Sequence, residues 1–554
     1  MNKSIALVPT FFALMVGYPL AAAAVHGYNI STWPTGVDTP PIWYAEIYQT
    51  YAGNLAQTYW SMLLGRCPAF VGGGQLQLAG ILLPALAAGF LLTSVSPLEP
   101  RRASTPLYGN ARFANASERR RMRVGLELGT DPETGQTIRV ALKSNLITLA
   151  PPRTGKSSGL LIPNLVAPER EAWFGPCVVL DPKGEVYTAV VERRRALGRK
   201  VYCLDPMQIA GGVDTWNPLS DINPKRNAYL QRTADALLPT AGVGEQKFFR
   251  EAAIKVIVAT FLAAHRKGDA TPLRIAELLA DQDALAEALT GLREVSAVST
   301  LSMIQKQPKN IGDIFTTAQQ AFTWCEDEQL SNLTSLSSFS FDEICRGEAD
   351  LFITLPTEDM ERLSPFLRWL LNDLFAAIRH NKPRERMLIY IDEAKVLGNF
   401  KEIVTGYGEL PGRNVSFWTF WQNRSQISAL YGPDDTKSLI SNSEIVTLSD
   451  PTPADPDELD LWSRALGDFT IMEENKTITE ATRDKVGSTS IGTFMKAVPL
   501  MSKDALASLP ASDLLVLVNS QRYPKHPLRI RKTRYDDERL RQFVTDLGGT
   551  AESA

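Results

Sequence analysis

The feature that most constrains this chain is an apolar run leading directly into a loop that bears glycine and lysine. Residues 145–150 (NLITLA) predict a buried strand, and residues 151–159 (PPRTGKSSG) predict a loop that opens a helix. This order of strand, loop and helix start is typical of a phosphate loop, in which backbone amides and the positive end of the helix dipole face an anion. The sequence therefore predicts a nucleotide-binding α/β domain.

The loop residues have separate predicted roles. Lys156 is expected to reach phosphate oxygens as a point charge, and Ser157 is expected to hold Mg²⁺ through its hydroxyl. Ala150 occupies the first position of the motif, where the strict form has glycine. With ATP as the ligand, the residues expected to bind nucleotide are Pro152, Arg153, Thr154, Gly155, Lys156, Ser157 and Ser158.

A second apolar run, residues 387–393 (MLIYIDE), ends in two carboxylates far downstream. Asp392 is expected to bind the Mg²⁺ shell, and Glu393 is expected to polarise the attacking water as general base. Alone, this run is equally typical of a strand that ends in a charged turn. Paired with a phosphate loop, it indicates the acidic half of the same nucleotide site.

A third apolar run, residues 415–421 (VSFWTFW), ends at Gln422. Because α/β sheets bind ligands at the carboxyl ends of their parallel strands, Gln422 is expected to contact the γ-phosphate or its water. The alternative is a glutamine that caps a surface helix. The predicted catalytic residues are thus Lys156, Glu393 and Gln422.

The N-terminal part of the chain predicts a membrane anchor. Residues 5–25 and 78–95 contain no charged residue and are long enough to cross a bilayer as helices. Arginines cluster after the second run, whereas Arg66 is the only Lys or Arg in residues 26–77. Positive flanks stay in the cytoplasm, so both termini are expected inside and the loop 26–77 in the periplasm. Residues 1–24 also resemble a cleaved signal peptide.

Composition excludes several classes of protein. Lys and Arg number 58 against 61 Asp and Glu, which argues against a polyanion-coating protein. The five cysteines form no C-x-x-C pair and the four histidines are scattered, so neither a zinc site nor a disulfide framework is expected.

Periodicity divides the remainder of the chain. Residues 248–267 have helical spacing and are expected to pack on the sheet, and residues 269–341 lack strong strands. Near the C-terminus, a strand at 513–518 precedes a basic cluster, which is expected either to touch nucleic-acid phosphates or to be a solvated edge. The cluster comprises Arg522, Lys525, Arg529, Arg531, Lys532 and Arg534. The predicted segments are a cytoplasmic lead-in (96–139), a nucleotide-binding domain in two parts (140–268 and 342–540), an all-α domain (269–341) and a short tail (541–554).

Several short motifs occur together in one order. They are 108–114 (YGNARFA), 178–185 (VVLDPKGE), 204–206 (LDP), 216–219 (WNPL), Gln422 and Gln426 with 431–432 (YG), and Ser463 with 466–467 (LG) and Thr470. With the phosphate loop and the acidic pair, this set resembles the TraG-type coupling ATPases of type IV secretion, within the FtsK/HerA-like group. The resemblance runs from the N-terminal spans almost to the C-terminus.

The resemblance implies a RecA-like P-loop ATPase domain with an all-α insertion, behind two transmembrane helices in the bacterial inner membrane. It implies ATP and Mg²⁺ as cofactors, a homohexamer, and contact with lipid and channel components. The implied substrates are a relaxase–single-stranded DNA complex or effector proteins. An arginine finger from a neighbouring subunit is expected, at Arg413 or, as second choice, Arg424. The alternatives are a nucleotide-gated receptor without motor activity and an FtsK-like DNA pump.

Overall fold

The computed structural model describes residues 102–545, except 221, 223–224, 239–244 and 480–487. The predicted spans 5–25 and 78–95 and the loop 26–77 lie outside the described residues. Within the described part of the chain, no helix has both the length and the apolar character that a membrane crossing requires. The described residues divide into two compact units, one of 102–108 with 470–497 and one of 109–469 with 498–545.

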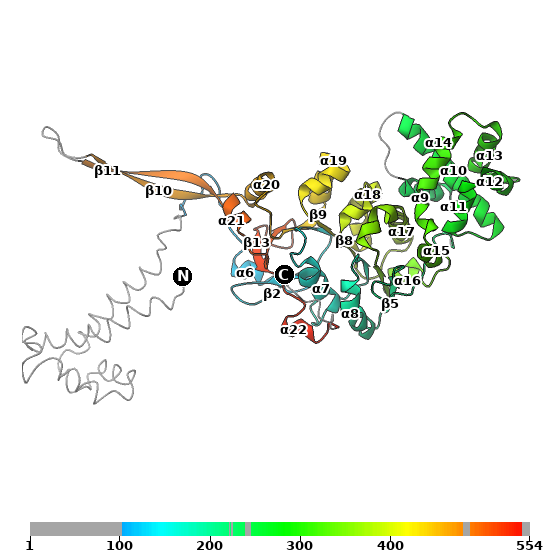
Figure 1. Ribbon diagram of the computed structural model, residues 1–554. Helices are drawn as coiled ribbons and strands as arrows, with labels where there is room; N and C mark the ends of the chain where they lie inside the picture. The colour runs from blue at the N-terminus through cyan, green and yellow to red at the C-terminus, as the bar shows by residue number, and fades with distance from the viewer. Residues whose placement is uncertain (1–101, 221, 223–224, 239–244, 480–487, 546–554) are drawn as a thin grey trace, which may run out of the picture. The chain divides into compact units, whose positions relative to one another are not determined.

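The second unit is built on a mixed sheet whose larger part is parallel (Figure 1). All but one of its parallel strands are buried along their length and rich in apolar residues, as expected where helices cover both faces. In spatial order the parallel strands are β9 (Ser443–Leu448), β3 (Asn145–Leu149), β8 (Val415–Trp421), β7 (Met387–Ile391), β4 (Cys177–Leu180), β6 (Ala349–Ile353) and β5 (Lys200–Leu204). The strands predicted at 145–150, 387–393 and 415–421 are therefore direct neighbours.

Antiparallel strands extend the sheet beyond β9. In order they are β12 (Asp513–Val518), β13 (Leu528–Arg531), β1 (Leu126–Thr130) and β2 (Thr137–Val140). The segment 96–139 was predicted to be a lead-in outside the nucleotide-binding domain, yet β1 and the start of β2 belong to the same sheet. Short helices α6 (Ala116–Arg119) and α22 (Glu538–Arg541) flank this extension.

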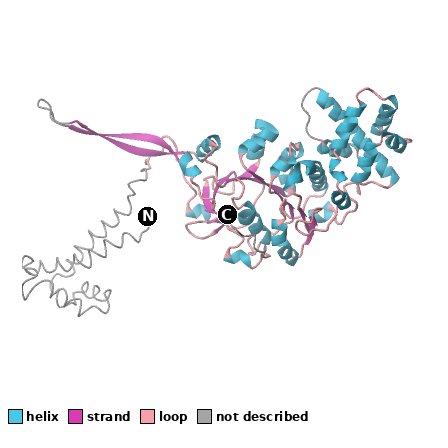
Figure 2. Cartoon of the chain, viewed as in Figure 1, coloured by secondary structure: helices cyan, strands magenta, loops and turns pink. Residues whose placement is uncertain are grey.

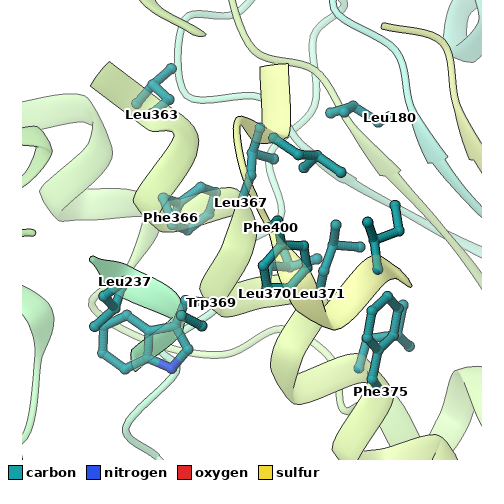
Figure 3. Packing of buried hydrophobic residues seen from close by; sticks show 14 of the residues in the cluster. Leu180, Leu237, Leu363, Phe366, Leu367, Trp369, Leu370, Leu371, Phe375 and Phe400 are labelled. Carbon is teal, nitrogen blue, oxygen red and sulfur yellow. The ribbon is translucent and has the colours of Figure 1, made fainter. Parts of the chain in front are cut away.

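A long helix, α17 (Met360–His380), packs one face of the parallel strands. Its side chains Phe366, Leu370 and Phe375 lie among other buried apolar residues, including Leu180 and Phe400 (Figure 3). The other elements around the sheet are the π-helical turn η4 (Ser157–Leu161), α7 (Ile162–Val166), α8 (Glu185–Ala196), η6 (Thr357–Asp359), η7 (Ala394–Leu397), α18 (Lys401–Glu409), η8 (Leu410–Arg413), α19 (Arg424–Ser441), α20 (Pro456–Leu466) and α21 (Lys503–Ala507).

A helical insertion lies between β5 and β6. It consists of α9 (Asn227–Leu237), α10 (Glu245–Lys267), α11 (Pro272–Ala280), α12 (Gln282–Leu289), α13 (Val295–Lys306), α14 (Ile311–Gln320), η5 (Thr323–Glu326), α15 (Glu328–Leu333) and α16 (Phe341–Cys345). The sequence predicted that residues 248–267 pack on the sheet. Instead, α10 packs mainly against α9 and α11 to α14, because its apolar residues face the helices that follow it. The helical layer thus begins before residue 269.

A two-stranded antiparallel hairpin, β10 (Asp468–Thr479) with β11 (Ser488–Pro499), was not predicted. It is drawn as a pair of long magenta arrows in Figure 2. Its runs contain Thr and Ile, which favour strands, but the pattern is interrupted by charged and polar residues.

Candidate nucleotide-binding site

Three neighbouring strands end at the same edge of the sheet. Leu149 of β3 pairs with Trp421 of β8, and Ile391 of β7 pairs with Thr419 of β8. The amide of Ala150 donates to the carbonyl oxygen of Trp421 at 2.8 Å. The chain segments that begin at Ala150, Gln422 and Asp392 therefore leave the sheet side by side.

The loop after β3 turns sharply before its helix starts. Arg153 has φ 63° and Gly155 has φ 72°, a left-handed region that only glycine enters without strain. The hydroxyl of Thr154 donates to the carbonyl oxygen of Pro151 at 2.9 Å. Lys156 Nζ lies 3.4 Å from the carbonyl oxygen of Ala150. The loop thus folds back on itself with its lysine at the strand end, as a phosphate-binding loop requires.

The hydroxyl and the carboxylate predicted to hold Mg²⁺ meet, although they are far apart in sequence. Ser157 Oγ donates to Asp392 Oδ2 at 3.2 Å. Asp392 Oδ1 is buried and has no hydrogen-bond partner among the described residues. Burial raises the pKa of Asp392, and the charges of Lys156 and Lys183 oppose that rise. A hard cation bound through oxygen ligands would satisfy Oδ1 and favour the charged carboxylate, so these residues fit Mg²⁺.

Glu393 follows directly and is partly buried. Burial raises its pKa, Lys156 lowers it, and the charge of Asp392 raises it further. A carboxylate with a raised pKa is a better proton acceptor at neutral pH than an ordinary one, which suits a general base. The backbone amide of Gln422 donates to Gln426 Oε1 at 3.1 Å. Because β8 lies between β3 and β7, Gln422 at its end stands between the phosphate loop and the acidic strand. Its contact with a γ-phosphate remains a prediction.

The two arginines proposed as a finger lie at different edges. Arg413 is in η8, before β8 begins, and donates to the carbonyl oxygen of Arg379 at 2.7 Å. It is thus at the amino end of β8, away from the site of its own chain. Arg424 starts α19 directly after Gln422 and Asn423, at the carboxyl end. The role of either residue toward a neighbouring subunit remains a prediction.

The sequence analysis missed a third carboxylate at this edge. Asp181 follows β4, the strand beside β7, and is buried. Burial raises the pKa of Asp181 to about 7, hydrogen bonding from the Tyr187 amide opposes this, and the charge of Asp392 adds to it. Its place at the end of a buried strand, the same signal that identified Asp392, was available in the sequence.

One member of the basic cluster is not solvated. Lys532 is buried, whereas Arg522, Lys525, Arg529, Arg531 and Arg534 are exposed. The ammonium of Lys532 donates to the carbonyl oxygen of Thr154 and, at 2.8 Å, to Ser449 Oγ. The prediction of a solvated edge or a nucleic-acid contact is therefore wrong for Lys532, because strand β13 delivers this residue to the phosphate loop. No local sequence pattern distinguishes it from its exposed neighbours.

Comparison with known proteins gives consistent matches. The family described as Type IV secretory system Conjugative DNA transfer matches residues 109–550. Protein VirD4 of Agrobacterium fabrum is 25% identical over 429 residues, 74% of this chain and 61% of VirD4. Conjugal transfer protein TraG of Escherichia coli is 24% identical over 545 residues, 86% of this chain and 84% of that protein. The chain thus spans about three fifths of the length of VirD4.

Among solved structures, plasmid coupling protein TrwB in complex with ADP and Mg²⁺ superposes with a TM-score of 0.56 at 17% identity. The match covers 79% of this chain and 97% of that chain. At this level of identity the likeness concerns the fold, a mixed α/β P-loop architecture.

Proposed function

Because the chain belongs to the Type IV secretory system Conjugative DNA transfer family, we propose that it is a coupling ATPase that recruits substrates to a type IV secretion channel and drives them in by ATP hydrolysis. The observation that carries the proposal is the meeting of Ser157 and Asp392, 3.2 Å apart, beside Lys156. A family member with a degenerate site would have no reason to keep this arrangement.

The chain's own residues divide the work of hydrolysis. The loop amides and Lys156 bind the phosphates, while Ser157 and Asp392 hold the metal. Bound Mg²⁺ supplies charge neutralisation at the β- and γ-phosphates. Glu393 takes the proton of the attacking water, and Gln422, at the end of the intervening strand, orients that water. The TrwB structure with ADP and Mg²⁺ supports this choice of nucleotide and metal.

Family membership supports the choice of substrates and partners, and the apolar runs 5–25 and 78–95 with their charged flanks are the basis for the location. The substrates are a relaxase–single-stranded DNA complex or effector proteins, and the partners are the channel components of the bacterial inner membrane. The chain acts there as a two-pass protein with both termini in the cytoplasm and as a homohexamer, in which Arg413 or Arg424 of each subunit serves its neighbour. Relatives named for conjugal transfer support DNA as a substrate.

A mating assay in a strain that lacks this chain tests the proposal. Wild type and the exposed-lysine control Lys437→Ala should restore DNA transfer or effector secretion, and Lys156→Ala and Glu393→Gln should not. Full transfer with Lys156→Ala would exclude the nucleotide site from the function. Full transfer with Glu393→Gln, in a protein shown to bind but not hydrolyse ATP, would identify a nucleotide-gated receptor instead of a motor.

A further inference from the structure

The segment that follows β13 lies against the outer side of the phosphate loop. The ammonium of Lys532 donates to the Thr154 carbonyl oxygen, and the amide of Tyr535 donates to the carbonyl oxygen of Ser158 at 2.9 Å. A side-chain carbon built on Gly159 would lie 3.3 Å from Cβ of Lys532. The middle of the loop and the start of its helix are therefore held by one short stretch, residues 532–535.

This stretch is itself fixed to the sheet. The amide of Lys532 donates to the carbonyl oxygen of Ser512 at 2.8 Å, and the hydroxyls of Thr533 and Thr130 are 2.9 Å apart. The other acceptor of the ammonium, Ser449, is anchored too, because its amide donates to the carbonyl oxygen of Leu149 at 3.0 Å. The lysine thus joins the ends of β13, β9 and β3 to the loop.

The contact with Thr154 determines where the next amide points. A peptide unit is planar and trans, so its carbonyl and its N–H point in opposite directions. The carbonyl oxygen of Thr154 is drawn outward by Lys532, and the N–H of Gly155 therefore faces the inner side of the loop. Gly155 adopts φ 72°. Glycine enters positive and negative φ about equally readily, so its own preference does not fix this conformation. Lys532 supplies the external constraint.

The chemistry suits a structural role for the charged lysine at neutral pH. Burial lowers the pKa of Lys532 to about 8, while Asp450 and Asp513 raise it and Arg534 lowers it. A buried ammonium that makes hydrogen bonds to two fixed acceptors is a strong, directional donor. Lysine side chains are rarely buried unless they are paired in this way.

We propose that Lys532 is a positioning residue for nucleotide binding, which holds the Thr154–Gly155 peptide in the orientation that aims the Gly155 amide at the phosphates. The inference rests on the proposed ATPase function. It assigns a part of the site to the antiparallel extension of the sheet, which lies outside the phosphate loop and the acidic strand.

The test is steady-state ATP hydrolysis and nucleotide binding by the purified full-length chain. Lys532→Met keeps the stem that packs on Gly159 and removes the donor, and Lys525→Met removes an exposed lysine of the preceding loop as control. Losing a hydrogen bond from a charged donor corresponds to about a tenfold to hundredfold change in a binding constant. We expect KM for Mg-ATP and Kd for Mg-ADP to rise by at least about tenfold in Lys532→Met, with partial recovery in Lys532→Arg and no change in the control.

A purely structural role gives a different result. Partial unfolding lowers the active fraction, so kcat falls while KM is unchanged, and that outcome overturns the proposal. An unchanged KM at full activity overturns it as well. If Lys532→Met does not fold, Ser449→Ala is measured instead, because it removes one of the two hydrogen-bond acceptors of the Lys532 ammonium. The KM of Ser449→Ala for Mg-ATP must then rise, and an unchanged KM refutes the role of Lys532. A wild-type chain that neither binds nor hydrolyses ATP removes the proposed function and this inference together, whereas binding by wild type with unchanged KM in the variants removes the inference alone.

Discussion

Replacing Asp392 with asparagine should make the nucleotide-free protein more stable and its response to Mg-ATP weaker. In the free protein the Asp392 carboxylate is costly, because Oδ1 is buried without a partner and burial raises its pKa. A neutral amide in the same place has a smaller desolvation penalty, so the substitution should raise the free energy of unfolding by about 1 kcal/mol. The melting temperature should rise by about 1–2 °C in the absence of nucleotide.

Mg-ATP should stabilise Asp392→Asn less than it stabilises wild type. At a concentration a hundred times Kd, Mg-ATP stabilises a protein by about 2.7 kcal/mol, and each tenfold loss of affinity removes about 1.4 kcal/mol of that. We expect Asp392→Asn to lose at least one such step, because the carboxylate next to Ser157 is the charged ligand of the metal. The assay is thermal unfolding of the full-length chain with and without Mg-ATP.

A matched control separates charge burial from metal binding. Asp373 on α17 is another buried carboxylate, and its contacts are with Tyr229 and Asn372, away from the phosphate loop. Asp373→Asn should keep the full Mg-ATP response. A variant of Asp392 that responds to Mg-ATP as wild type does, or that is less stable than wild type without nucleotide, would refute the assignment of Asp392 as metal ligand.

Other predictions concern catalysis, packing and pH. Glu393→Gln should bind Mg-ATP with unchanged Kd while phosphate release slows by about a hundredfold or more, and normal turnover would exclude Glu393 as the base. Asp350→Ala should cost about 3–5 kcal/mol in urea unfolding, because it leaves the fully buried guanidinium of Arg194, 2.7 Å away, without its partner; a loss below about 1 kcal/mol would contradict this. Burial raises the pKa of Asp373 from 3.8 to about 7, so its contribution to stability is complete below pH 3.8 and is lost as pH rises through 7, by up to about 4 kcal/mol. The free energy of unfolding of Asp373→Asn minus that of wild type should therefore increase between pH 4 and 8. A difference that does not change with pH would show that folding leaves the pKa of Asp373 unchanged.

The elements that the sequence predicted best are those whose signal is local. The strands that lead into Ala150, Asp392 and Gln422 are largely apolar runs followed by loops, and the carboxyl ends of parallel strands meet at one edge of a sheet. The role of Lys532 was not predictable, because it depends on β13 pairing beside β1, a non-local contact between opposite ends of the chain. The position of α10 was mistaken for a related reason. A helix with a wide apolar surface packs equally well on a sheet or on other helices, and periodicity does not distinguish the two.

The most direct measurement is phosphate release from Mg-ATP by the full-length chain and by Lys156→Ala, with folding of both checked by thermal unfolding. If the loop after β3 and the carboxylates after β7 act on one triphosphate, wild type turns over ATP and the variant falls to background at unchanged stability. Equal rates of phosphate release in the two proteins would show that this loop does not take part in ATP hydrolysis.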